Sequence, residues 1–181
     1  MFKGFNIDKF KKMKPPPDNS FTTMQEVKHL KTIPLNKSVV KKFDDIESTF
    51  KSVANKNNIK DYDAKLVAKV IEESAPIILK LKKHFNRPRP KAIAKKLNID
   101  MKDHEMQSMK TPSYPSGHSA QGVLIGMLLA DKHPQASSEF LKAGKNISDS
   151  RNIARAHYKS DSRVGEKLGK ELYNYIKNKN K

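Results

Sequence analysis

Apolar residues recur at steps of three and four along much of this chain, which is the spacing of one face of an α-helix. One series consists of Val39, Val40, Phe43, Ile46, Phe50 and Val53, and a second of Leu66, Val67, Val70, Ile71, Ile77, Ile78 and Leu81. Runs of alternating β-branched residues between tight-turn sequences are nearly absent. The pattern predicts an all-α protein, folded as a single-domain helical bundle.

The expected domain spans residues 21–181, because a chain of 181 residues can bury one hydrophobic core and needs no second domain. Residues 1–20 contain three consecutive prolines, Pro15–Pro17, which lack a backbone donor and disfavour helix in the residue before them. We therefore expect residues 1–20 to form an extended N-terminal arm. Within the domain, Pro76 is expected to kink or divide the second apolar series.

The chain carries 37 Lys and Arg against 19 Asp and Glu, which gives a formal net charge of +18. Such a charge attracts anions of any kind, from small phosphate esters to nucleic acid or an anionic membrane surface. Charge alone does not choose among these partners. The absence of cysteine excludes disulfides and thiolate metal sites.

The longest apolar stretch, residues 122–130, is far shorter than the roughly 20 residues that a membrane-spanning helix requires. Lysines interrupt the apolar positions of residues 1–14, and no small-residue cleavage site of a secretory signal follows them. The sequence predicts a soluble protein, located in the cytoplasm or derived from an exported form by processing.

A first basic cluster is KKHFNRPRP at residues 82–90. Two registers place a lysine seven residues before an Arg-Pro pair: Lys80 with Arg87, and Lys82 with Arg89. We prefer Lys82 and Arg89. Guanidinium groups bind phosphate oxygens in bidentate fashion and a lysine adds a point charge, so the segment is typical of a phosphate clamp. The alternative is a basic, exposed helix end.

A second cluster, PSGH at residues 115–118, directly precedes the apolar stretch. Ser116 stands where a helix should begin, and Gly117 permits close approach of the backbone. The free amides of a first helical turn attract anions, so His118 would lie beside any phosphate held there. The alternative is an ordinary helix cap with a surface histidine.

The third cluster is SRNIARAHYKSD at residues 150–161. If this segment is one helix, His157 and Asp161 lie one turn apart on the same face. Asp161 could then hold one ring nitrogen of His157 as N–H and leave the other as a free lone pair. Arg151 would lie about 120° away from that face. The alternative is a surface pair of His and Asp.

Residues 91–114 separate the first two clusters; they are polar and carry three methionines. Such a segment suits a loop or short helices that cover a pocket. A tolerated surface insertion is the other interpretation.

With the three clusters in this order, the chain resembles the type 2 phosphatidic acid phosphatase / vanadium haloperoxidase superfamily. KKHFNRPRP and SYPSGHSAQG most resemble the soluble bacterial class A non-specific acid phosphatases, although those enzymes are exported, longer and less basic. The motifs cover residues 82–161, and similarity of fold is expected from about residue 15 to 175. The resemblance implies that phosphate is bound by Lys82, Arg89, Ser116, Gly117 and Arg151.

The same resemblance implies that His157 is the nucleophile, Asp161 orients it, and His118 is the general acid. It implies a metal-independent phosphomonoester hydrolase that acts through a phosphohistidine and needs no cofactor. The expected partner is a small phosphate ester. Weak association with anionic surfaces and a homodimer stay open.

The sequence leaves three alternative functions open. A hydrolase of lipid phosphates or pyrophosphates would keep the fold and change the substrate. Vanadate-dependent halide oxidation would use the same pocket, although such enzymes are generally much longer. A basic nucleic-acid-binding protein with a vestigial site would account for the charge, but no nucleic-acid-binding module is recognisable.

Overall fold

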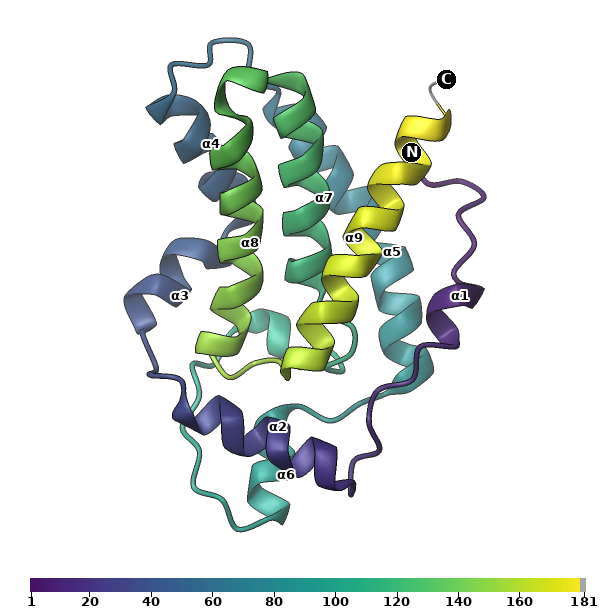
Figure 1. The fold of residues 1–181 in the computed structure, drawn as a ribbon, viewed down its shortest axis with the longest axis vertical. Coiled ribbons are helices and arrows are strands. Elements are labelled where there is room, and N and C mark those ends of the chain that lie inside the picture. Colours follow the sequence, from purple (N-terminus) through teal and green to yellow (C-terminus); the bar gives the residue numbers. More distant parts are fainter. Residues whose placement is uncertain (180–181) are drawn as a thin grey trace.

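The computed structural model describes residues 1–179, and all regular structure in that part of the chain is helical (Figure 1). The prediction of an all-α fold is confirmed. The elements are α1 Asp8–Lys11, α2 Phe21–Thr32, α3 Lys37–Asp44, α4 Ile46–Lys56, α5 Ala64–Phe85, α6 Pro90–Lys96, the 3₁₀ turn η1 Gln107–Lys110, α7 Gly117–Lys132, the 3₁₀ turn η2 Pro134–Ala136, α8 Ser137–Ile153 and α9 Lys159–Lys179.

The central helix of the bundle is α7, which packs against α8 on one side and α9 on the other. Its apolar stretch is buried, with Leu124 and Leu129 fully inaccessible to solvent. Glycines bring the backbones into direct contact: a Cβ on Gly144 of α8 would lie 2.4 Å from the carbonyl oxygen of Gly122. A Cβ on Gly165 of α9 would lie 2.4 Å from the carbonyl oxygen of Ser116. These contacts fix the start of α7 against α9.

The two predicted apolar series behave differently at their midpoints. The first is divided at Asp45, which ends α3 and whose side chain caps α4 by accepting a hydrogen bond from the amide of Ser48 at 3.0 Å. The second forms one uninterrupted helix of 22 residues, α5, although Pro76 lies inside it. Asn86 ends α5 in the left-handed region, with φ of 48°, a conformation that asparagine tolerates.

The N-terminal segment is not an extended arm over its whole length. Residues 8–11 form α1, and the side chains of Phe2, Ile7 and Phe10 are buried in the main core. Apolar side chains that can reach a core are stabilised by leaving water, so this segment packs instead of projecting. Outside residues 8–11 this segment contains no helix, and the proline run Pro15–Pro17 lies in that non-helical part as expected.

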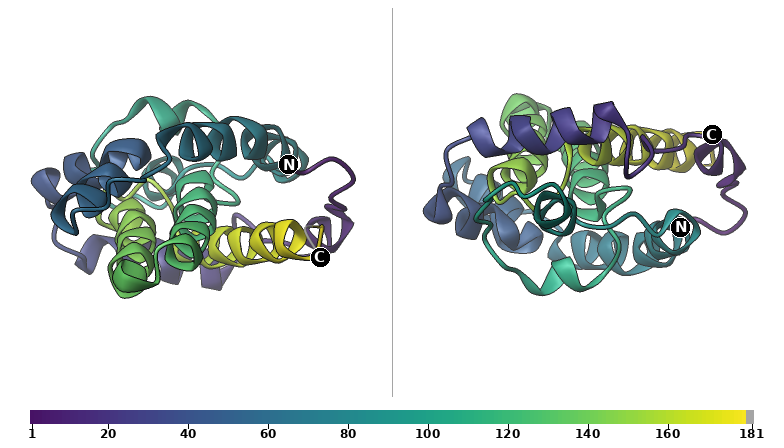
Figure 2. Two further views of the ribbon diagram at one scale, coloured as in Figure 1. Left: turned by 90° about the horizontal axis from the view of Figure 1, so that it is seen from above. Right: turned by 90° about the horizontal axis from the view of Figure 1, so that it is seen from below.

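Four helix ends meet at one end of the bundle, which is the lower end in Figure 1. They are the C-termini of α5 and α8 and the N-termini of α7 and α9. Helix α2 lies across this end with α6 beside it, and the two end-on views show α2 and α5 on opposite sides of the molecule (Figure 2). Within residues 1–179, no helix has both the length and the apolar composition that a membrane crossing requires.

Candidate active site

A cavity of about 190 Å³ opens where these helix ends meet. The lining residues are Ala75, Ile78, Leu79, Lys82, Arg89, Ser108, Thr111, Gly117, His118, Gln121 and His157. Residues from all three sequence clusters therefore line one cavity. Of the predicted site residues, Ser116, Arg151 and Asp161 are buried behind its wall and do not line it.

The first cluster presents Lys82 and Arg89 to the cavity. The ammonium of Lys82, in the last turn of α5, donates to the carbonyl oxygen of Pro112 at 2.6 Å. Arg89 donates to the carbonyl oxygens of Thr111 and Ser108 at 2.9 and 2.8 Å, so the two cations hold η1 and the residues directly after it in place. Of the alternative register, Lys80 is exposed to solvent.

Of the two cations that line the cavity, Lys82 has the pKa that departs further from its ordinary value. Burial and the nearby charge of Arg89 lower the pKa of its ammonium to about 7. A bound anion would oppose both causes, because its negative charge favours the ammonium form of Lys82. The site is therefore built for a negatively charged ligand.

The second cluster starts α7 where the sequence predicts. Ser116 is the N-cap, and its hydroxyl oxygen accepts a hydrogen bond from the amide of Ser119 at 3.3 Å. Gly117 is the first helical residue and lines the cavity, where a Cβ would lie 3.3 Å from Cγ2 of Ile78. The helix N-terminus is thus open to an anion at Gly117, while the hydroxyl of Ser116 is engaged by the helix itself.

His118 is oriented by Asp44, a residue that the sequence motifs do not include. Nε2 of His118 lies 2.9 Å from the carbonyl oxygen of Asp44. Because a carbonyl only accepts, Nε2 carries a hydrogen, and Nδ1 is the lone pair of the neutral ring. The carboxylate of Asp44 also accepts from Nη1 of Arg151 at 2.9 Å. Burial and the charge of Arg151 lower the pKa of His118 to about 4.

The side chain of Arg151 lies at the end of α8 and is fully buried. Besides Asp44, its guanidinium contacts the hydroxyl oxygen of Ser150 through Nε at 3.0 Å and through Nη2 at 2.8 Å. Arg151 therefore adds positive charge beside His118 without lining the cavity.

The third cluster is not the continuous helix that the spacing predicts. α8 ends at Ile153 and α9 begins at Lys159, so His157 lies in the turn between them. Arg155 adopts the left-handed region with φ of 57°. The amide of Ala156 donates to the carbonyl of Arg151, and that of Arg155 to the carbonyl of Asn152. These two bonds form a Schellman motif, in which glycine usually occupies the position of Arg155.

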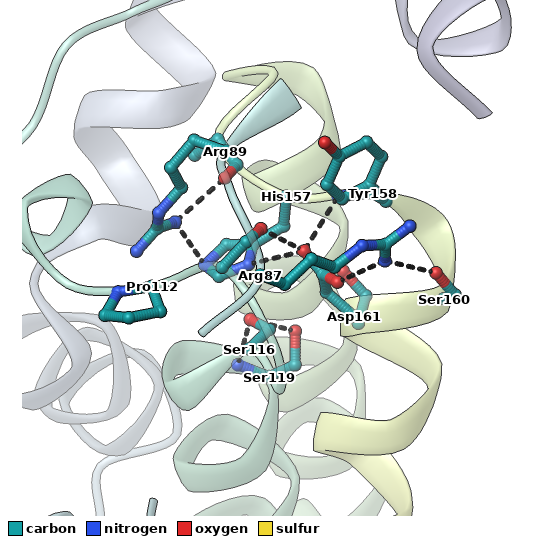
Figure 3. Close-up of polar contacts among 12 residues, drawn as sticks. Arg87, Arg89, Pro112, Ser116, Ser119, His157, Tyr158, Ser160 and Asp161 are labelled. Carbon is teal, nitrogen blue, oxygen red and sulfur yellow. Dashed lines mark hydrogen bonds and ion pairs between the residues drawn. The ribbon is translucent and has the colours of Figure 1, made fainter. Parts of the chain in front are cut away.

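His157 and Asp161 nevertheless meet, as predicted, with Nδ1 of His157 3.2 Å from Oδ2 of Asp161. On the other side of the ring, Nη1 of Arg89 lies 2.9 Å from Nε2 (Figure 3). Arginine is only a donor, so Nε2 is the lone pair and Nδ1 carries the hydrogen that Asp161 accepts. Burial, followed by the charge of Arg89, holds the pKa of His157 well below its ordinary value. The ring is neutral, with its lone pair aimed at Arg89.

Asp161 is saturated with donors. It accepts from Nη1 of Arg87 at 2.7 Å and from the amide of Tyr158 at 3.1 Å (Figure 3). It also accepts from the hydroxyl of Ser113. Burial alone would raise the pKa of this carboxyl, but the hydrogen bond from His157 and the charge of Arg87 keep it below its ordinary value. Asp161 is therefore a stable carboxylate that orients His157.

No group of three or more His, Cys, Asp and Glu side chains suited to hold a metal ion occurs within residues 1–179. The polar part of the cavity consists of two cations, a helix N-terminus, two histidines and the residues Ser108, Thr111 and Gln121. Such an arrangement can bind a tetrahedral anion, offer it a nucleophilic nitrogen and deliver or remove a proton.

Comparison with known proteins identifies relatives of this chain. The chain is 34% identical over 88 residues to a non-specific acid phosphatase of Salmonella typhimurium, an alignment that covers 49% of this chain and 35% of the relative. It is 33% identical over 98 residues to a non-specific acid phosphatase of Providencia stuartii, covering 54% and 39%. An acid phosphatase of Zymomonas mobilis is 30% identical over 102 residues, covering 56% and 38%. The chain thus spans less than half the length of these relatives.

The match to a family extends further along the chain. Residues 66–169 match the PAP2 superfamily, and this range includes all three clusters and the helices α5 to α8 with the start of α9. On that match and on its all-α fold, the chain belongs to the PAP2 superfamily.

Proposed function

We propose that this protein hydrolyses phosphomonoesters through a covalent phosphohistidine at His157, without a metal ion. One observation carries the proposal: the lone pair of His157 Nε2 and the cations Lys82 and Arg89 face the same cavity as His118. The names of the curated relatives, which are acid phosphatases, support the hydrolysis of phosphate esters as the overall reaction.

The first step requires Arg89 to change partners. Nη1 of Arg89 lies against the nitrogen that must attack phosphorus. A bound phosphoryl group offers Arg89 oxygen acceptors with a full charge, which bind a guanidinium more strongly than a neutral imidazole does. Arg89 then stabilises the equatorial oxygens, and Nε2 of His157 is free for in-line attack.

As the N–P bond forms, positive charge develops on the imidazole and Asp161 stabilises it through Nδ1–H. The P–O bond to the leaving group breaks, and His118 in its cationic form protonates the leaving oxygen. Since Nε2 of His118 is bound to Asp44, the transferred proton comes from Nδ1. In the second step, neutral His118 takes a proton from water, which attacks phosphorus and releases His157. Lys82, Arg89 and the amide of Gly117 stabilise the oxygens throughout.

The ligands that this cavity can enclose are small. At about 190 Å³ it lies below the roughly 300–1,000 Å³ of sites that enclose drug-sized ligands. It therefore takes the phosphoryl group and the first atoms of the leaving group, and the remainder of the substrate extends into solvent.

A second substrate class, phosphates with an apolar leaving group such as lipid phosphates, is supported by one wall of the cavity. Ala75, Ile78 and Leu79 of α5 form this wall, and Leu79 is 41% exposed. An apolar chain leaving the cavity could lie against that side chain.

The test is hydrolysis of p-nitrophenyl phosphate with a chelator present, followed by trapping of the enzyme with labelled substrate and a quench that avoids acid. We expect turnover and an acid-labile phosphoenzyme in the parent protein. His157→Ala should lose both, while His29→Ala, at an exposed histidine of α2, should lose neither. Turnover that depends on added Mg²⁺ or Zn²⁺, or full activity of His157→Ala, would overturn the proposal.

A further inference from the structure

We propose that Glu26, on α2, is a positioning residue for the nucleophile and acts on it through Arg87 and Asp161. This inference rests on the function proposed above. It assigns a task in the reaction to a helix that lies outside the range matched by the superfamily, residues 66–169.

The four side chains form a continuous series of contacts. Nδ1 of His157 lies 3.2 Å from Oδ2 of Asp161, and Oδ1 of Asp161 lies 2.7 Å from Nη1 of Arg87. Nη2 of Arg87 lies 3.0 Å from Oε2 of Glu26. The side chains of Arg87 and Asp161 are 1% and 0% exposed, and that of Glu26 is 15% exposed. The series therefore runs from the nucleophile through the interior to α2.

Arg87 has little freedom to leave this position. Its guanidinium carbon lies 3.7 Å from the centre of the Tyr158 ring, and Nη1 also donates to the hydroxyl of Ser160 at 2.8 Å. Stacking and hydrogen bonds from a planar guanidinium fix both its plane and its direction. Arg87 thus points one edge at Asp161 and the other at Glu26.

Glu26 also holds the backbone that carries Asp161. Its carboxylate accepts the amide of Ser160 at 2.8 Å and the hydroxyl of Ser160 at 2.8 Å. Ser160 belongs to the first turn of α9 and directly precedes Asp161. A carboxylate at a helix N-terminus binds the free amides there and is stabilised by the helix dipole. Glu26 therefore places both partners of the ion pair.

The charges explain why a second carboxylate matters to the reaction. Asp161 and Arg87 neutralise each other, so this pair alone has no net charge to offer the imidazolium that forms during attack. With Glu26 included, the series is neutral when His157 is cationic. Without Glu26, a buried and uncompensated positive charge would remain beside the developing imidazolium, and buried unpaired charge is strongly unfavourable. Glu26 is expected to favour the transition state more than the bound substrate.

The experiment compares Glu26→Gln with the parent on p-nitrophenyl phosphate. We expect kcat to fall by about tenfold or more, and KM to change by no more than about twofold, because charge develops only after binding. Glu105→Gln is the matched control, since it removes the same charge from an exposed carboxylate whose partner is Lys91. It should leave both constants unchanged.

The double variant Glu26→Gln/Arg87→Gln separates this role from a purely structural one. Removing Arg87 as well leaves Asp161 as the sole counter-ion, so we expect the double variant to be more active than Glu26→Gln alone. A structural role predicts the reverse, because losing two buried contacts should damage the protein more than losing one. Should Glu26→Gln fail to fold, Glu26→Asp retains the charge at a greater distance and should lower kcat without raising KM.

Kinetics of Glu26→Gln equal to those of the parent would overturn the inference. So would a double variant less active than the single variant. An active parent protein with either of these results leaves the proposed phosphatase function standing, whereas a parent that hydrolyses no phosphomonoester overturns both.

Discussion

His118 has a pKa that conflicts with the task proposed for it. Burial and the charge of Arg151 lower that pKa to about 4, so the ring is neutral near pH 6 in the free protein. A general acid must carry its proton when the leaving group departs. The negative charge of a bound phosphoryl group opposes the effects of Arg151 and Lys82, and so raises the pKa of His118. The substrate thereby helps to protonate the acid that its own cleavage needs.

Replacing His118 by Asn should separate substrates by their leaving groups. Asn cannot donate a proton to an alkoxide, so His118→Asn should lower kcat by about 10²–10⁴-fold on alkyl phosphates. The loss should be much smaller on p-nitrophenyl phosphate, whose phenolate leaves without protonation. Rapid-quench measurements should then show accumulated phosphoenzyme, because the second step lacks its base. Equal losses on both substrates, with no accumulation, would remove the general-acid role.

Lys82 should give anion binding a distinct pH dependence. Its pKa of about 7 means that the ammonium loses its proton above that pH unless an anion is bound. Binding then takes up a proton, so affinity for sulfate should fall as the pH rises from about 7, by up to about tenfold per pH unit. Sulfate is the suitable probe because it keeps its two charges in this range. Calorimetric titration measures the effect.

The matched controls for Lys82 come from its own helix. Lys82→Met should weaken sulfate binding and abolish this part of the pH dependence. Lys80→Met should change neither, because Lys80 is exposed and does not line the cavity. Arg87 cannot serve as a control for Arg89, since its removal would leave Asp161 and Glu26 without their shared partner. Equal effects of the two lysine variants would contradict the assignment of Lys82 to the phosphate clamp.

The helix ends around the cavity depend on glycines as much as on motif residues. Gly165 lets α9 approach the carbonyl oxygen of Ser116, which caps the start of α7. Gly165→Ala should destabilise the protein by about 1–3 kcal/mol, because the new methyl must displace that backbone. Since the displaced residue precedes Gly117 in the cavity wall, kcat/KM should fall as well. Denaturant unfolding and steady-state kinetics check the two effects.

Gly144→Ala provides the comparison at the opposite face of α7. Its Cβ would approach the carbonyl oxygen of Gly122, a residue that does not line the cavity. We expect a similar loss of stability with a much smaller loss of kcat/KM. If both variants lose activity to the same extent, the contact between α9 and Ser116 has no special part in shaping the site.

At the level of elements, the sequence predicts the helices well and the turns between them poorly. Periodicity identifies α5 and the start of α7 because apolar spacing and a Ser cap are local signals. The turn between α8 and α9 has no such signal, because Arg155 occupies the left-handed position that glycine usually marks. Three backbone carbonyls hold the guanidinium of Arg155, those of Lys31, Ile33 and Lys102. These partners are distant in sequence, so this conformation follows from tertiary contacts.

The candidate site also contains residues with local sequence signals and residues placed by tertiary contacts alone. Lys82, Arg89, Gly117, His118 and His157 could be predicted, since each belongs to a short motif. Asp44 and Glu26 could not, because each reaches the site from a helix remote in sequence and carries no motif. Such residues become visible only when the fold brings their elements together.

At the scale of the whole molecule, part of the excess of basic residues lies in the interior, around the cavity. Lys82, Arg87 and Arg151 are buried around the cavity and Arg89 is half-buried there, so four positive charges face the three negative charges of Asp44, Asp161 and Glu26. Burial and this excess of positive charge keep His118 and His157 neutral at pH values where free histidine is partly protonated. Anion binding, histidine protonation and stability are therefore linked through a single site.

This linkage predicts how stability changes with pH. The unfolded chain binds a proton at His118 near pH 6.5, whereas the folded protein does so only near pH 4, so acidification through this interval favours unfolding. The contribution of His118 is about 3 kcal/mol at most, or on the order of 10 °C in Tm for a protein of this size. The lowered pKa of His157 acts in the same direction.

Saturating sulfate should reduce this loss of stability at low pH, because a bound anion raises the pKa values of His118 and His157 in the folded state. Thermal unfolding of the parent and of His118→Asn, with and without sulfate, measures the effect: Asn does not titrate, so its Tm should depend less steeply on pH. His29→Asn, at an exposed histidine, should follow the parent. If all three proteins respond identically to acid, the general rise in net positive charge governs stability and the neutral histidines of the cavity do not.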